Sequence, residues 1–190
     1  MKFILVLFVL IAHVVVAQPP VAYRSFHIEH KEVVWVQVYH EEPVIEKLPE
    51  RLFNHLKSKV WIKDIRFEGP DIVAELTDYR PDYKRYGGKF TNTSSIVRTG
   101  RFAGKVLINF KEGKYRVILQ GITYQALQAA TGSGKATIEQ HEVSGTLNDF
   151  ALNNLRTNFK KRNALNLDIL HSSFKDSFTI KVDQLIDEDW

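Results

Sequence analysis

The sequence predicts an α+β fold in which helices cover one face of an antiparallel sheet. Two observations carry this prediction. Residues 104–122 alternate apolar and polar side chains on either side of a tight turn, and residues 146–185 carry apolar side chains at helical spacing. With an earlier strand, helix and hairpin, the chain reads as about five strands in the order β-α-β-β-β-β-α, with a long C-terminal helical segment.

The hairpin of residues 104–122 has one register that separates its two faces. If Lys111 pairs with Lys114 across a turn at Glu112 and Gly113, one face is wholly apolar. Glycine at position 113 can adopt the positive φ that such a turn requires. The apolar face then pairs Phe110 with Tyr115, Ile108 with Val117 and Val106 with Leu119, and the other face pairs Asn109 with Arg116 and Lys105 with Gln120, with Leu107 and Ile118 between them.

Three further elements are predicted before this hairpin. Glu32–His40 alternates valines with bulkier and polar residues, which is typical of a strand. A helix is expected from about Pro49 to Ser58, because proline suits a first turn and an apolar stripe follows it. A second hairpin turns at Gly69-Pro70, and its shared face holds Trp61, Ile65 and Phe67 with Ile72, Ala74 and Leu76.

The remaining segments are predicted as loops and helices. Residues 79–101 show no clear period and indicate a long irregular loop, and residues 124–145 indicate a connector. Thr146 is a plausible N-cap, with Asp149 three residues later. Two apolar stripes then indicate helices, one formed by Leu147, Ala151 and Leu155 and the other by Leu167, Leu170, Phe174, Phe178 and Leu185, and the basic run Lys160, Lys161 and Arg162 is expected at a solvated helix end.

The N-terminus has the pattern of a secretory signal peptide over residues 1–17. One positive charge at Lys2 precedes the apolar run Phe3–Val16, which ends at the small residue Ala17. We therefore expect an exported protein, periplasmic or secreted, with an uncleaved anchor as the alternative. Residues 18–31 are expected to form a lead-in segment, and residues 32–190 a single α+β domain whose helical part starts at about 146. No later stretch is long and apolar enough to span a bilayer.

Composition narrows the chemistry. The chain has no cysteine, which excludes disulfides, cysteine nucleophiles and thiolate metal sites. Its formal net charge is +4, a mildly basic balance that permits contact with anionic partners.

The hairpin sequence GKVLINFKEGKYRVILQGITY carries a family resemblance. Together with the signal peptide and the order of elements, it resembles a bacterial secreted family of unknown function with a TATA-binding-protein-like fold, over about residues 33–124. The resemblance implies the fold and brings with it no reaction, cofactor or catalytic residue. A fold label shared with a DNA-binding protein does not transfer DNA binding.

No motif in the sequence predicts a catalytic residue, a cofactor site or a metal site. The segment 130–136 looks like a phosphate-binding loop but lacks its first glycine and the hydroxyl residue after Lys135. His27 and His30 would point to opposite faces of a strand, so they could not share a metal ion. No nucleophile elbow is present, and the sequence favours a non-enzymatic role.

The segment 80–101 is the best candidate for recognition. Basic and aromatic side chains interleave there, and such a mixture can stack on rings while holding phosphates or carboxylates. An ordinary loop that packs its aromatics inward is the alternative. The candidate partner-binding residues are Arg80, Tyr83, Lys84, Arg85, Tyr86, Lys89, Phe90, Arg98 and Arg101.

Three functional hypotheses follow from the sequence. The first is a non-catalytic exported domain that binds a protein or a cell-envelope component. The second is a binder of nucleic acid or another polyanion through residues 80–101, with affinity that falls steeply as salt is added. The third is a hydrolase whose site assembles from distant residues, which requires a pocket with a histidine beside a serine or a carboxylate.

Overall fold

The computed structural model describes residues 21–40, 47–130 and 139–180. Its strands form one antiparallel sheet in the order β1-β2-β3-β7-β6-β5-β4, with β8 paired to β7. The elements are β1 (Ala22–Tyr23), β2 (Phe26–Glu29), β3 (Glu32–His40), α1 (Leu48–Lys57), β4 (Ile62–Glu68), β5 (Asp71–Tyr79), α2 (Ser95–Thr99), β6 (Arg101–Lys111), β7 (Lys114–Ala130), β8 (Glu139–Thr146), α3 (Leu147–Ala151), the 3₁₀ turn η1 (Lys161–Asn163) and α4 (Ala164–Phe178).

The predicted α+β class and the register of the β6–β7 hairpin are confirmed. Lys111 pairs with Lys114, and every predicted pair from Phe110–Tyr115 back to Val106–Leu119 is present. Gly113 has a φ of +66°. The apolar face of the hairpin is the buried one, since Val106, Ile108, Val117 and Leu119 are almost fully enclosed.

The sheet has eight strands among the described residues, against the five or so expected. Residues 22–29, read from sequence as a lead-in, form β1 and β2 at one edge. Residues 124–146 are not a connector, because β7 continues to Ala130 and β8 pairs back along it. The polar character of β8 misled the prediction, because none of residues 141–146 is buried and no apolar row marks that strand.

The strand β7 changes neighbours halfway along its length. Residues 114–119 pair with β3, whereas residues 123–130 pair with β8 on the same side. Gly121 lies between the two regions with a φ of +61°, opposite Gly104 at a break in the β6–β7 register. A glycine there allows the bend without a Cβ penalty.

Two more bulges lie in neighbouring strand pairs. In each, two residues oppose one residue of the next strand, and one of the two has a left-handed backbone: Asp64 in β4 (φ +49°) and Asp78 in β5 (φ +53°). Bulges bend a strand and increase its twist. With the break at Gly121, they curve the sheet so that its inner face can wrap around a helix.

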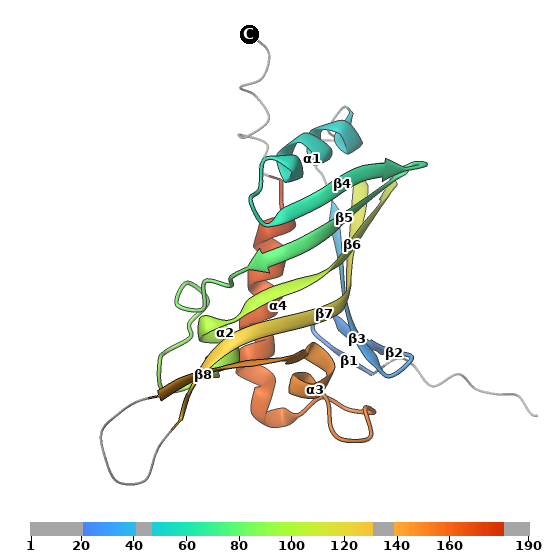
Figure 1. Cartoon of the computed structure of the whole chain (residues 1–190). Coiled ribbons are helices and arrows are strands. Elements are labelled where there is room, and N and C mark those ends of the chain that lie inside the picture. The colour runs from blue at the N-terminus through green and yellow to red at the C-terminus, as the bar shows by residue number, and fades with distance from the viewer. Residues whose placement is uncertain (1–20, 41–46, 131–138, 181–190) are drawn as a thin grey trace, which may run out of the picture.

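The helix α4 fills that inner face, and in Figure 1 it runs behind β5, β6 and β7. Phe174 packs edge-on against Trp35 and Phe102, with ring centroids 5.6 and 6.4 Å apart. Leu167, Leu170 and Phe178 are also fully buried. Side chains of α1, α2 and α3 join the same core, which confirms helices on one face of the sheet.

Four tyrosines bind α4 to the sheet through its backbone. Their hydroxyls donate to carbonyl oxygens of the helix, two of which belong to the last turn and have no partner within the helix. The bonds run from Tyr23 to Ala164 O (3.2 Å), Tyr79 to Ser173 O (3.0 Å), Tyr39 to Lys175 O (2.9 Å) and Tyr115 to Phe178 O (2.6 Å). They come from β1, β5, β3 and β7, so the helix is attached to both halves of the sheet.

The C-terminal part is less helical than predicted. Thr146 is the N-cap of α3, accepting from Asp149 N at 3.3 Å, as expected. However, α3 ends at Ala151, and residues 152–160 form an irregular loop. The basic run Lys160, Lys161 and Arg162 therefore precedes α4 instead of ending a helix. Leu185 lies outside the described residues.

We predict that Tyr115→Phe lowers the free energy of unfolding by about 1–3 kcal/mol, because it removes the only donor to the buried carbonyl of Phe178 among the described residues. Urea unfolding measures the change. Tyr124→Phe is the matched control: the Tyr124 ring packs on Phe102, and its hydroxyl has no hydrogen-bond partner among the described residues. Equal losses in the two variants would show that the hydroxyl bond to α4 contributes nothing.

We predict that stability falls as the pH drops from neutral toward mildly acidic values, in part through His171. Burial, then Lys175 and Arg24, lowers the pKa of His171 below its ordinary value, while Asp168 opposes them. As the pH falls, the unfolded chain therefore binds the proton before the folded protein does. The contribution of His171 to stability is fully present above pH ~6.5 and is lost as the pH falls through the lowered pKa. Trp35 Nε1 also donates to His171 Nδ1 at 3.4 Å, a bond that needs that nitrogen unprotonated.

His171→Asn should reduce this pH dependence, as measured by urea midpoints at neutral and acidic pH. His30→Asn is the control, since His30 is an exposed turn residue with positive φ, which asparagine tolerates. The same loss of stability on acidification in both variants and the parent would count against the assignment.

Candidate functional site

The segment between β5 and α2 is an ordered loop docked on α4. Ser94 N donates to the buried side chain of Asn166 on α4 at 2.9 Å. Gly88 packs so closely that an added Cβ would lie 2.7 Å from Tyr83 O and 3.0 Å from Ile169 Cδ1. The loop predicted as irregular therefore has a fixed path, and it separates two clefts.

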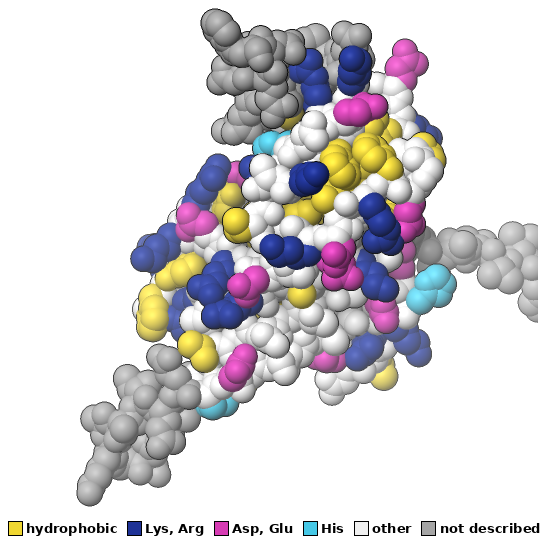
Figure 2. Space-filling model, turned by 45° about the horizontal axis from the view of Figure 1, so that its top comes forward, with side chains coloured by type: hydrophobic (Ala, Val, Ile, Leu, Met, Phe, Trp, Pro, Cys, Tyr) yellow, Lys and Arg dark blue, Asp and Glu magenta, His cyan; other side chains and the backbone are white. Residues whose placement is uncertain are grey.

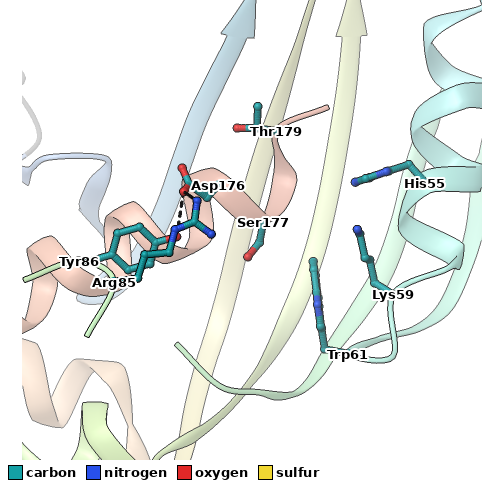
Figure 3. Close-up of a pocket in the computed structure, with 8 residues that line it drawn as sticks. All are labelled: His55, Lys59, Trp61, Arg85, Tyr86, Asp176, Ser177 and Thr179. Carbon is teal, nitrogen blue, oxygen red and sulfur yellow. Dashed lines mark hydrogen bonds and ion pairs between the residues drawn. The ribbon is translucent and has the colours of Figure 1, made fainter. Parts of the chain in front are cut away.

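The first, called the helix-end cleft, is a hollow of about 330 Å³ at the C-terminal end of α4. It lies between α1 on one side and the 80–94 loop on the other (Figure 3). Its lining residues are His55, Lys59, Trp61, Arg85, Tyr86, Asp176, Ser177 and Thr179.

Asp176 organises one wall of the helix-end cleft. Its Oδ2 accepts from Arg85 Nη2 and from the Tyr86 hydroxyl, both at 2.9 Å (Figure 3). The Arg85 guanidinium also lies over the Tyr86 ring, 5.4 Å from its centroid. Burial, reinforced by the hydrogen bond and charge of Asp176, raises the pKa of Tyr86 to about 12. On this wall, the positive charge of Arg85 is therefore balanced by the negative charge of Asp176.

The opposite wall carries His55 and Lys59. Burial lowers the pKa of His55, and the positive charge of Lys59 lowers it further. Ser177 lies across the cleft, but its hydroxyl donates to Ser173 O at 2.8 Å and contacts the Tyr79 hydroxyl at 2.7 Å. Within the described residues no hydrogen bond joins His55 to Ser177 or Asp176, so the cleft gathers the residue types of a hydrolase without a nucleophile–base pair.

The second, called the arginine cleft, is a hollow of about 500 Å³ between α2, the start of β6 and the β7–β8 ribbon. The ribbon reaches α2 through Thr99, whose hydroxyl accepts from Leu127 N at 2.9 Å and donates to Leu127 O at 3.0 Å. The lining residues are Arg80, Arg98, Thr99, Arg101, Gln125, Ala126, Leu127 and Glu142.

The three arginines of this cleft have different surroundings. Arg101 and Arg80 are both exposed, and Arg101 forms an ion pair with Asp78 at 3.5 Å. Arg98 is partly enclosed: the ring of Phe90 covers its guanidinium at 3.8 Å. The Nε and Nη1 atoms of Arg98 are buried and have no hydrogen-bond partner in the described part of the chain.

The nine residues singled out in the sequence thus separate in space. Arg80, Arg98 and Arg101 meet in the arginine cleft with Phe90 against Arg98, while Arg85 and Tyr86 line the helix-end cleft. Arg80 also lines a neighbouring hollow of about 530 Å³ with Arg85 and Tyr86. Tyr83 packs against the core, and Lys84 and Lys89 are exposed outside both clefts.

Sequence reasoning missed several lining residues. Gln125 and Glu142 lie on the β7–β8 ribbon, which read as a connector, and His55 and Lys59 looked like ordinary residues at the end of a helix. Only the three-dimensional contacts bring them to a cleft.

No group of three or more His, Cys, Asp or Glu gathers among the described residues at a distance suited to a metal ion. None of the described helices is long and apolar enough to cross a bilayer. The phosphate-loop-like segment around 131–136 lies outside the described residues.

No protein-family model and no curated protein matches the chain. Two solved bacterial structures do. One, described as a DUF4468 family protein from Bacteroides ovatus ATCC 8483, has a TM-score of 0.41 and 11% identity over 80% of this chain and 90% of its own. The other, a TBP-like protein from Parabacteroides distasonis ATCC 8503, has a TM-score of 0.42 and 13% identity over 79% and 92%. These descriptions agree with the resemblance named from the sequence.

We predict that Asp176→Asn lowers the pKa of Tyr86 from about 12, because the carboxylate charge that disfavours tyrosinate is removed. Stability should fall by less than about 1 kcal/mol, since the Arg85–Asp176 pair is exposed to solvent. Ultraviolet titration of tyrosinate, compared with the same titration of Tyr86→Phe, measures the shift. Asp82→Asn is the control, as its carboxylate accepts from Arg85 N instead. An unchanged Tyr86 pKa in Asp176→Asn would contradict the prediction.

Proposed function

We propose that this protein is an exported, non-catalytic binding domain that holds a carboxylate group of a protein or envelope partner in the arginine cleft. The observation that supports this most is Arg98. Two of its guanidinium nitrogens are enclosed and unpartnered in the described chain, although a buried donor without a partner costs about 1–3 kcal/mol. Such groups in a folded protein call for an explanation, and a bound anion is one.

The chemistry of the cleft favours a carboxylate. Arginine presents a planar fork of N–H donors that matches a carboxylate bidentately, and Phe90 holds the fork of Arg98 flat. The Phe90 side chain is 76% exposed, and its ring has to move aside for a partner to reach the enclosed nitrogens. Arg80 and Arg101 add positive charge to the cleft, which outweighs the single negative charge of Glu142.

The cleft is large enough for an acidic side chain or chain end together with its neighbouring groups. Its hollow measures about 500 Å³, and Leu127 supplies an exposed apolar contact in the lining. This fits an acidic residue displayed by a protein or an envelope polymer. Export is proposed from the pattern of residues 1–17 alone.

A general polyanion binder is the second candidate, and one observation weighs against it. The basic residues of the 80–101 segment do not form a strip of free positive charge, because Arg85 pairs with Asp176 and Arg101 pairs with Asp78. On the face shown in Figure 2, Lys and Arg side chains are interspersed with Asp and Glu. A nucleic acid backbone needs a longer single-sign path.

Fluorescence anisotropy with a labelled oligoglutamate peptide, a single-stranded oligonucleotide and polyphosphate tests the proposal. We expect the peptide to bind and Arg98→Ala to weaken it about tenfold or more, since charge-assisted bonds of a bidentate pair contribute about 1.5–3 kcal/mol. Arg98→Lys should recover only part of the affinity, because it keeps the charge and loses the fork.

The paired control is Lys84→Ala with Lys89→Ala, which removes exposed charge outside both clefts. Thermal unfolding of each variant by circular dichroism shows whether the fold is kept. Tighter binding of the oligonucleotide or polyphosphate, with a steep salt dependence, would replace the proposal by the polyanion candidate. Equal effects of the Arg98 and lysine variants would overturn it.

A further inference from the structure

The loop between α3 and α4 presents an apolar side chain at its tip. Leu155 is 75% exposed, among the largest exposed fractions of any apolar residue described. In Figure 1 this loop lies at the end of the molecule opposite α1. An isolated exposed leucine is ordinary on a protein surface. Leu155 differs in the hydrogen bonds that hold it there and in the charges that surround it.

Hydrogen bonds within the loop fix its conformation and keep Leu155 exposed. Leu152 and Phe159 form an isolated β-bridge at its base, and Lys160 N donates to Ala151 O at 2.7 Å. Within the loop, the Asn153 side chain accepts from Thr157 N at 2.8 Å, and Asn153 N donates to Asn158 O at 2.9 Å. These bonds fix the tip while Leu152 is buried in the core, so the exposure of Leu155 does not arise from a frayed end.

Positive charge surrounds this leucine. Residues 152–163 contain Arg156, Lys160, Lys161 and Arg162 and no acidic residue. Two of these charges are engaged by α3: Arg156 pairs with Asp149 at 3.0 Å, and Lys160 Nζ donates to Asp149 O at 2.6 Å. Lys161 and Arg162 are exposed, and they line a shallow hollow with Leu155, Asn153 and Asn154.

The start of the described chain lies beside the same loop. The Tyr23 ring lies 6.0 Å from that of Phe159, and the Tyr23 hydroxyl donates to Ala164 O. Val21, just before β1, is 43% exposed. The first described strand is thus joined to the base of this loop through Tyr23.

We infer that this end, the lipid-facing tip formed by Leu155, Lys161 and Arg162, docks on the surface of an anionic lipid bilayer. An exposed aliphatic side chain can enter the headgroup region while lysine and arginine beside it contact the phosphates. The fixed loop pays no further ordering cost on contact, because its internal hydrogen bonds are already made. The tip shares no residue with the arginine cleft, so the two proposals can fail independently.

Sedimentation with lipid vesicles tests the inference, using the whole protein without truncation. The vesicles contain phosphatidylglycerol mixed with phosphatidylcholine, or phosphatidylcholine alone. Each basic residue near an anionic surface contributes roughly a fivefold factor, so Lys161→Glu with Arg162→Glu should lower partitioning onto the mixed vesicles about tenfold or more. Leu155→Ser should lower it several-fold while leaving the charge unchanged.

The matched control is Lys111→Glu with Lys114→Glu, which makes the same charge change at the turn between β6 and β7. It should bind as the parent does. The inference is overturned if the control loses as much binding as the tip variant, if the parent binds phosphatidylcholine vesicles equally well, or if neither tip variant changes partitioning. Retained oligoglutamate binding in the Lys161 and Arg162 variant would confirm that the arginine cleft acts separately.

Discussion

The bonds between tyrosine hydroxyls and the backbone of α4 are the constraint on which the rest of the structure depends. Apolar burial would hold a helix in the concave face of a sheet without fixing its rotation or its position along its own axis. Hydroxyls from β1, β3, β5 and β7 fix both, because each carbonyl that accepts one occupies a single place on the helix. They also give donors to two carbonyls of the last helical turn, Lys175 O and Phe178 O, which lack a partner within the helix.

A fixed α4 positions both clefts. Its exposed side presents Asp176 to Arg85 and Tyr86, and its buried Asn166 holds Ser94 at the N-cap of α2. The 80–94 loop is therefore stretched between two points of one helix, and this directs Arg98 toward the β7–β8 ribbon and Arg85 away from it. The separation of the basic residues into two sites follows from where the loop is attached. The order of these basic residues in the sequence does not indicate this separation.

The sequence was informative wherever one face of an element is buried. The register from Lys105–Gln120 to Lys111–Lys114 could be predicted because a slip by one residue would expose its whole apolar row. Prediction failed for β8, whose residues such as Glu142 and Ser144 face water and leave no period. It failed again at the candidate sites, because the pairing of Arg85 with Asp176 joins residues 91 positions apart. Nothing in the local pattern around either residue indicates that contact.

The attachment of α4 also sets the order in which the protein can assemble. The hydroxyl bonds of Tyr39 and Tyr23 span 136 and 141 residues, so the contacts that complete the core are among the most distant in the chain. Hairpins such as β6–β7 can form early, yet their apolar face has nothing to pack on until residues 164–178 arrive. Contacts of such long range make folding slow. In a chain still being synthesised, the inner face of the sheet therefore lacks its packing partner until residues 164–178 are available.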